Sequence, residues 1–162
     1  MIHFCPRCWH EIHAGADPCP HCGGTTSEDG TPFVERLLAT LRHPDPTRAG
    51  LAIDILAGRL HEPRSVAALI ELLSESQDLA VLVQAARGLG LLGDRAAVAP
   101  LARVLSNTEM AFVVRGEAAS ALGRLGGEGA VAALQAMVND PMDSVSRRAR
   151  QALAFLRAEG GT

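Results

Sequence analysis

The sequence predicts an all-α protein, a short solenoid of stacked helix pairs preceded by a small metal-binding module. Hydrophobic residues make up 48% of the chain but aromatic residues only 3%, so its core has to be built from Ala, Leu and Val, which suit closely packed helices. An apolar motif recurs at intervals of 32 and 33 residues, ending at Leu69, Leu101 and Leu134. All four cysteines lie within the first 22 residues, in two Cys-x-x-Cys pairs.

The two cysteine pairs carry the chemistry of the chain. Cys5 and Cys8 enclose Pro-Arg, Cys19 and Cys22 enclose Pro-His, and ten residues separate the pairs. Each pair can form a tight knuckle whose thiolates point at one metal, and four sulfurs complete the tetrahedral shell that zinc prefers. A closed shell leaves no position for water or substrate. We therefore expect one structural zinc ion (Zn²⁺), whose binding supplies folding free energy to this small segment.

Two other chemistries use the same residues: a pair of disulfides in a secreted domain, or a redox-active Cys-Pro-His-Cys pair. The N-terminus has no basic region followed by an apolar stretch, which argues against secretion and stable disulfides. A redox motif needs a preceding strand, whereas Cys19 follows the turn sequence Ala-Asp-Pro. The spacing therefore favours zinc.

The segment from Phe4 to Gly23 resembles the short zinc-ribbon family, in which two Cys-Pro-x-Cys-Gly knuckles lie about ten residues apart. Trp9 stands where that family usually places glycine. It is either an exposed anchor for a partner or a cover for the metal site. We expect the histidines of the segment to be solvated or hydrogen-bonded to the sulfurs and not to be ligands; they are His3, His10, His13 and His21.

The composition divides the chain into a zinc ribbon (residues 1–24), a flexible linker (25–31) and a helical repeat domain (32–162). The linker is small and polar, without apolar periodicity, so the ribbon is expected to move relative to the repeats. Thr31-Pro32 provides a helix start, and a helical face follows before Pro44; it is formed by Phe33, Leu37, Leu38 and Leu41.

Each following unit is predicted to contain two helices. A polar start such as Asp45-Pro46, Asp78 or Asp143 opens the first helix, and the second helix runs to Ser74, Ser106 or Asn139. The last unit stops after one helix, whose arginines are expected to form a polar cap. One helix pair cannot bury both of its faces, so the core has to form by stacking of neighbouring pairs.

Residues 90–101 and 143–153 resemble HEAT repeats, notably the short kind found in phycobilin lyases, and the resemblance spans about residues 45–157. It implies an α-α solenoid with a concave face for a protein partner. By analogy, the second helices of the units line that face, where Glu71 and Arg103 occupy equivalent places. Pro100 is expected inside a helix, where it removes one hydrogen bond and kinks the helix.

The enzymes with comparable architecture require residues that this chain lacks. Deoxyhypusine hydroxylases resemble it and bind iron through His-Glu pairs on several repeats, but His61-Glu62 is the one such pair in this solenoid, and we expect a turn there. No cysteine outside the ribbon could act as a nucleophile. A helical-repeat DNA glycosylase needs a basic face and aromatic residues, which this composition does not provide.

The charge pattern argues against general nucleic-acid binding, while a local basic patch, or a ribbon that contacts nucleic acid or the transcription apparatus, stays open. The 15 basic residues are balanced by 18 acidic ones, and the net charge of −3 lacks the basic excess that phosphate binding needs. No apolar run approaches membrane-spanning length, and we expect a cytoplasmic protein.

The sequence therefore predicts a non-catalytic scaffold or adaptor for protein–protein interaction. The partner contacts expected are Glu71, Arg103 and Trp9. The alternative is a phycobilin-lyase-like or chaperone-like factor that acts on a chromophore or modified substrate.

Overall fold

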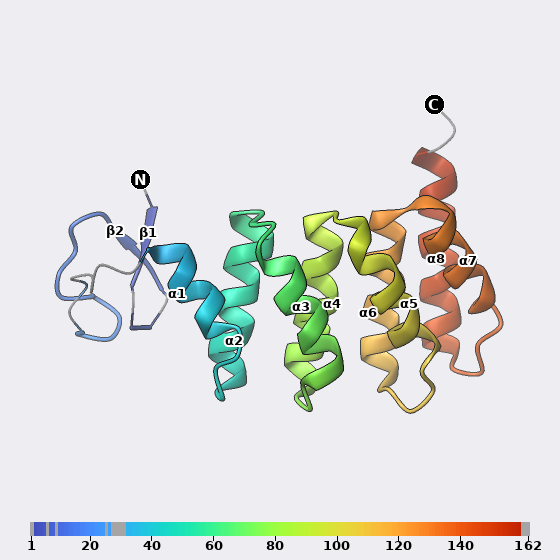
Figure 1. The fold of residues 1–162 in the computed structure, drawn as a ribbon, viewed down its shortest axis with the longest axis horizontal. Helices are drawn as coiled ribbons and strands as arrows, with labels where there is room; N and C mark the ends of the chain where they lie inside the picture. Colours follow the sequence, from blue (N-terminus) through green and yellow to red (C-terminus); the bar gives the residue numbers. More distant parts are fainter. Residues whose placement is uncertain (1, 6, 9, 25, 27–31, 160–162) are drawn as a thin grey trace.

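The computed structural model describes residues 2–5, 7–8, 10–24, 26 and 32–159. A two-stranded ribbon stands at one end of an elongated stack of helices (Figure 1). The elements are β1 (Ile2–Phe4), β2 (Glu11–His13), α1 (Phe33–Thr40), α2 (Pro46–Ile53), the π-helix η1 (Asp54–Arg59), α3 (Ser65–Glu75), α4 (Leu79–Leu92), the 3₁₀-helix η2 (Arg95–Ala97), α5 (Val98–Ser106), α6 (Phe112–Leu125), α7 (Gly127–Ala136) and α8 (Asp143–Glu159). The predicted fold class is confirmed.

The helices form two layers. One layer holds α2, α4, α6 and α8, and the other holds α1, α3, α5 and α7 (Figure 1). The core lies between them and consists of Ala, Leu, Val and Ile side chains, as the composition predicts. None of the described helices has the length and apolar character to span a bilayer.

Aspartates begin two helices as predicted. The carboxylate of Asp45 accepts a hydrogen bond from the backbone N–H of Thr47 at 2.9 Å, and that of Asp78 accepts from Ala80 at 2.9 Å. Both satisfy amide groups that have no partner within the first helical turn. Asp143 also opens its helix as predicted, as the first residue of α8.

Two details of the predicted helices are corrected. Pro100 lies in the first turn of α5, which begins at Val98, so its missing N–H removes no hydrogen bond from the helix interior. The helix α7 ends at Ala136, three residues before the predicted Asn139, because the chain turns there: the N–H groups of Met137 and Asp140 bond to carbonyls three residues back, at 3.0 and 3.1 Å.

Small residues allow α4, α6 and α8 to approach each other closely. A Cβ atom added at Gly90 would lie 2.8 Å from the Cα of Ala121, and one added at Gly123 would lie 2.8 Å from the Cβ of Ala152. Carbon atoms in favourable contact are about 3.5–4.0 Å apart. These two helix crossings therefore require glycine.

The first long helix ends in a π-helical turn that the sequence pattern did not predict. The N–H of Leu60 bonds to the carbonyl of Ile55, five residues back, at 2.9 Å. A π-turn inserts one extra residue into the helix and rotates the residues after it about the helix axis. Arg59, at the end of this turn, faces the ribbon and pairs with Glu11.

Candidate functional site

The four cysteines come together at the end of the β1–β2 hairpin. β1 pairs with β2 antiparallel, with Ile2 opposite His13 and Phe4 opposite Glu11. The hairpin places Cys5 and Cys8 beside the second knuckle. The Sγ atoms of Cys5 and Cys22 are 3.7 Å apart, as are those of Cys8 and Cys19, and all four lie within 4.8 Å of one another.

These distances fit a tetrahedral metal site. Zn–S bonds of about 2.3 Å place the sulfurs of a tetrahedron about 3.8 Å apart, close to the observed separations. The sulfurs are well outside the disulfide bond length of about 2.05 Å, and the four cysteines are free thiols. Four cysteines that could hold a metal ion therefore converge at the site, as predicted.

The knuckle backbone favours a thiolate at Cys19. Desolvation would raise the pKa of this thiol, but hydrogen bonds from the backbone N–H groups of Cys22 and His21 lower it to about 6. Burial raises the pKa of Cys8 to about 12 in the absence of a metal. One deprotonated sulfur in a group of four is a suitable first ligand for a soft cation.

The surroundings of the four sulfurs leave little space. A Cβ at Gly24 would lie 2.6 Å from the Cδ of Arg7 and 3.4 Å from the Sγ of Cys22. The rings of His10 and His21 stack on each other at 4.5 Å, and neither enters the group of cysteines. The metal-binding group found among the described residues thus consists of the four cysteines, without His10 or His21.

Two of the predictions fall on residues outside the described part of the chain. Trp9 is one of them, so its role as a partner anchor stays a prediction. The predicted linker is the other, because residues 25 and 27–31 are not described. The domain boundaries likewise stay predictions.

The ribbon makes contacts with the helices that the sequence did not reveal. The ring of Phe4 stacks on Phe33 of α1, with centroids 5.5 Å apart and planes 6° from parallel. The guanidinium of Arg59 lies 5.4 Å from the centroid of Phe4 and forms an ion pair with Glu11. In the structure the ribbon packs against α1 and η1; the expected movement of the ribbon relative to the repeats stays a prediction.

His61-Glu62 lies at a turn before Pro63, as predicted. His61 adopts a positive φ of 49°, in the place where the next repeats have Gly93 and Gly126. The Glu62 carboxylate accepts hydrogen bonds from the Nε of Arg64 at 2.9 Å and from its backbone N–H at 3.1 Å, and these lower the pKa of Glu62. Within the described residues, the cysteine site is the one convergent group of three or more metal-binding side chains.

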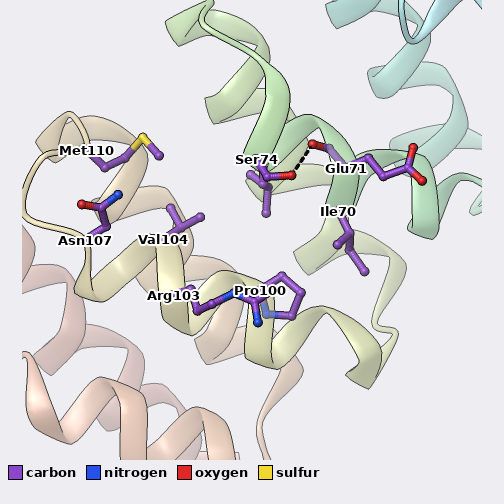
Figure 2. Close-up of a pocket in the computed structure, with 9 residues that line it drawn as sticks. Ile70, Glu71, Ser74, Pro100, Arg103, Val104, Asn107 and Met110 are labelled. Atoms are coloured by element: carbon purple, nitrogen blue, oxygen red, sulfur yellow. Dashed lines mark hydrogen bonds between the residues drawn. The ribbon is translucent and has the colours of Figure 1, made fainter.

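A groove of about 330 Å³ lies between α3 and α5 (Figure 2). It is lined by Ile70, Glu71, Leu73, Ser74, Pro100, Arg103, Val104, Asn107 and Met110. Glu71 forms an ion pair with Arg42, whereas Arg103 has no ion-pair partner among the residues that the structure describes. The two residues predicted to contact a partner thus lie on one groove; whether they bind one stays a prediction.

A buried ion pair links α6 to the loop before α8. Arg115, 5% exposed, donates from Nε to the carbonyl of Leu105 at 2.9 Å and forms an ion pair with Asp140. Burial alone would raise the pKa of Asp140, but the Arg115 hydrogen bonds and the Met142 N–H lower it. The sequence analysis missed this pair. The sequence does contain a hint of it, because Arg115 occupies the position that the buried Leu82 has in the preceding repeat.

Comparison with known proteins identifies the class of the solenoid. HEAT repeats match residues 34–109 and 66–154, which together cover well over half of the chain. The chain therefore belongs to the HEAT repeat family. No curated protein sequence matches it.

Two solved structures show the same helical architecture. Human deoxyhypusine hydroxylase in complex with glycerol is 28% identical, with a TM-score of 0.66 over 80% of this chain and 45% of that one. The complex of CpcE and CpcF of phycocyanin lyase from Nostoc sp. PCC7120 is 25% identical, with a TM-score of 0.54 over 83% of this chain and 69% of that one. The chain spans less than half the length of the hydroxylase.

Proposed function

We propose that this protein is a non-catalytic adaptor whose HEAT solenoid binds a partner protein. The observation that carries the proposal is the groove between α3 and α5, where half-buried apolar side chains lie beside the unpaired guanidinium of Arg103 (Figure 2). Arginine next to an apolar floor is typical of the residues that dominate protein interfaces. The groove crosses from one repeat to the next, as partner sites on stacked repeats do.

The adaptor has a structural zinc ion in its ribbon. Four thiols at tetrahedral separations support this assignment, because zinc is commonly held by closed cysteine shells that leave no open position. The metal stabilises the hairpin, and Phe4 and Glu11 then connect the hairpin to α1 and η1. We place the protein in the cytoplasm, where thiols remain reduced.

Crosslinking from the groove tests the adaptor proposal. A photoreactive residue at Ser74 should crosslink a single partner in cells, whereas one at Glu128, exposed on α7, should not. The charge reversal Glu71→Arg with Arg103→Glu should remove the crosslink, and Glu128→Arg should leave it unchanged. Equal crosslinking of the wild type and the double variant would refute the groove as the partner site.

A second candidate function is a phycobilin-lyase-like or chaperone-like factor that handles a chromophore. It is favoured by the likeness to the CpcE and CpcF complex of phycocyanin lyase. Against it, the clefts described on this protein measure about 290 to 340 Å³, at the lower end of the ligand-pocket range of roughly 300–1,000 Å³. Mixing the zinc-loaded protein with phycocyanobilin and recording absorbance separates the two: a shifted band with a fixed stoichiometry supports the second function.

A further inference from the structure

The layer opposite the groove presents a continuous face. The glycine contacts at Gly90 and Gly123 bring α4, α6 and α8 close together, so their outward side chains share one surface. The inner side of a curved stack has the more closely spaced helices. This spacing favours the α4–α6–α8 layer as the concave one, and does not support the prediction that Glu71 and Arg103 lie on the concave face.

Arginines line this face at successive repeats: Arg87 on α4, Arg124 on α6 and Arg148 on α8. An added Cβ at Gly90, one turn after Arg87, would lie 3.4 Å from a terminal nitrogen of Arg124, so Arg124 reaches across to α4. Arg148 donates a hydrogen bond to the Oγ of Ser120 on α6 at 2.9 Å. Arg124 and Arg148 thus lie close together on α6 and α8, and Arg87 is exposed on the adjacent α4, one turn before Gly90.

Only part of this positive charge is neutralised. Glu117 is the carboxylate shared by two of the arginines, and its oxygens lie 3.8 Å from the nitrogens of both Arg124 and Arg148, beyond ordinary hydrogen-bond length. The side chains of Arg124 and Arg148 are 43% and 50% exposed. Arg87 is exposed and has no ion-pair partner in the described ranges. Arg124 and Arg148 therefore share one carboxylate at long range, and positive charge is left over on this face.

An apolar site lies next to the arginines. A cleft of about 290 Å³ is lined by Ser120, Gly123, Arg124, Arg148, Gln151, Ala152 and Phe155. Phe155, which lines this cleft, is 49% exposed. An exposed aromatic ring flanked by guanidinium groups can bind an apolar side chain while the arginines bind the charges beside it.

We propose that the face formed by Arg87, Arg124, Arg148 and Phe155 binds an acidic segment of a partner protein, with carboxylates on the arginines and an apolar side chain on Phe155. Guanidinium groups bind carboxylates through paired hydrogen bonds. A nucleic acid fits less well, because Glu117 would face a phosphate and the face contains one exposed aromatic ring for base stacking. This inference does not rest on the groove, which lies on the other layer.

Peptide binding to the full-length, zinc-loaded protein tests the proposal. The probe is a fluorescein-labelled peptide of alternating Glu-Glu and Leu residues, and its control carries Gln in place of Glu; both are followed by anisotropy. We expect the acidic peptide to bind at least about tenfold more tightly than the Gln peptide, and its affinity to fall as salt rises. Equal binding of the two peptides would overturn the inference.

Variants locate the binding face. Arg87→Glu is the first choice, because Arg87 makes no ion pair with any described residue that folding could need, and the double variant Arg124→Gln with Arg148→Gln is the second. Each should weaken binding by about tenfold or more, with circular dichroism unchanged. Phe155→Ala should weaken it by about threefold or more.

A variant outside both the groove and this face serves as the matched control. Arg95→Glu, at an exposed position in η2, changes the net charge as Arg87→Glu does, so it should leave acidic-peptide binding within about twofold of wild type. Equal losses for the two variants would show a general charge effect and overturn the assignment. Single-stranded DNA that competes for the face more strongly than the acidic peptide would also overturn it.

Discussion

Replacing Gly90 with alanine places a methyl group where α4 touches α6. The added carbon would lie 2.8 Å from the Cα of Ala121 and 2.9 Å from its Cβ, so the helices would have to separate by about 0.7–1.2 Å to restore ordinary contact. Overpacking of this kind costs about 1–3 kcal/mol. Alanine recovers about 0.5–1 kcal/mol through its better helix propensity. Taken at the middle of both ranges, the expected net loss of unfolding free energy is about 1 kcal/mol.

A second glycine in the same layer provides the matched control. The nearest atom to a Cβ added at Gly50 in α2 is the Cγ of Gln84, at 3.9 Å, so Gly50→Ala should raise the unfolding free energy by about 0.5–1 kcal/mol. Urea unfolding followed by circular dichroism measures both variants. If Gly90→Ala proves as stable as Gly50→Ala, the close α4–α6 approach does not constrain this position, and the inference of a concave face from the helix spacing fails with it.

Three further changes test the remaining features. Asp140→Asn leaves Arg115 buried without its counter-ion, so thermal unfolding should show a loss of about 3–5 kcal/mol near neutral pH. Because the folded-state pKa of Asp140 is lowered, the ion pair contributes fully above the unfolded pKa of about 3.9 and its contribution disappears as the pH falls through the folded pKa; the variant and wild type should therefore converge in acid, and a constant difference would contradict this. Cys19→Ser should remove bound zinc, measured by elemental analysis after dialysis, whereas retained stoichiometric zinc would refute the four-sulfur site. Asp78→Ala should cost about 1 kcal/mol in urea unfolding through loss of the α4 cap, and an unchanged midpoint would show that the cap contributes nothing.

The sequence predicted the features that depend on local pattern. Repeat spacing is enough to recognise the helix pairs, because each unit buries the same positions, and the cysteine spacing is enough to recognise the four-thiol site. Capping by Asp45 and Asp78 was also predictable, since an aspartate just before a helix accepts a hydrogen bond from a backbone N–H of the first turn, only a few residues away.

Contacts between distant residues were not predictable in the same way. The Arg115–Asp140 pair joins positions 25 residues apart, and Arg59 reaches Glu11 across the predicted linker. In both cases the sequence shows a charged residue, and only the folded arrangement shows its partner. The π-turn also escaped prediction, because the residues of η1 suit an ordinary α-helix equally well.

The stacked arrangement of helix pairs has a mechanical consequence. A globular core resists deformation as a whole, but here each helix pair contacts only the pairs beside it. Small rotations between neighbouring pairs therefore add along the length of the stack. We therefore expect the solenoid to bend and twist elastically along its length. A partner that spans several repeats can change the superhelical twist of the solenoid without breaking any single contact. The close helix crossings at Gly90 and Gly123 should resist this change, and the wider spacing between α3 and α5 should accommodate it.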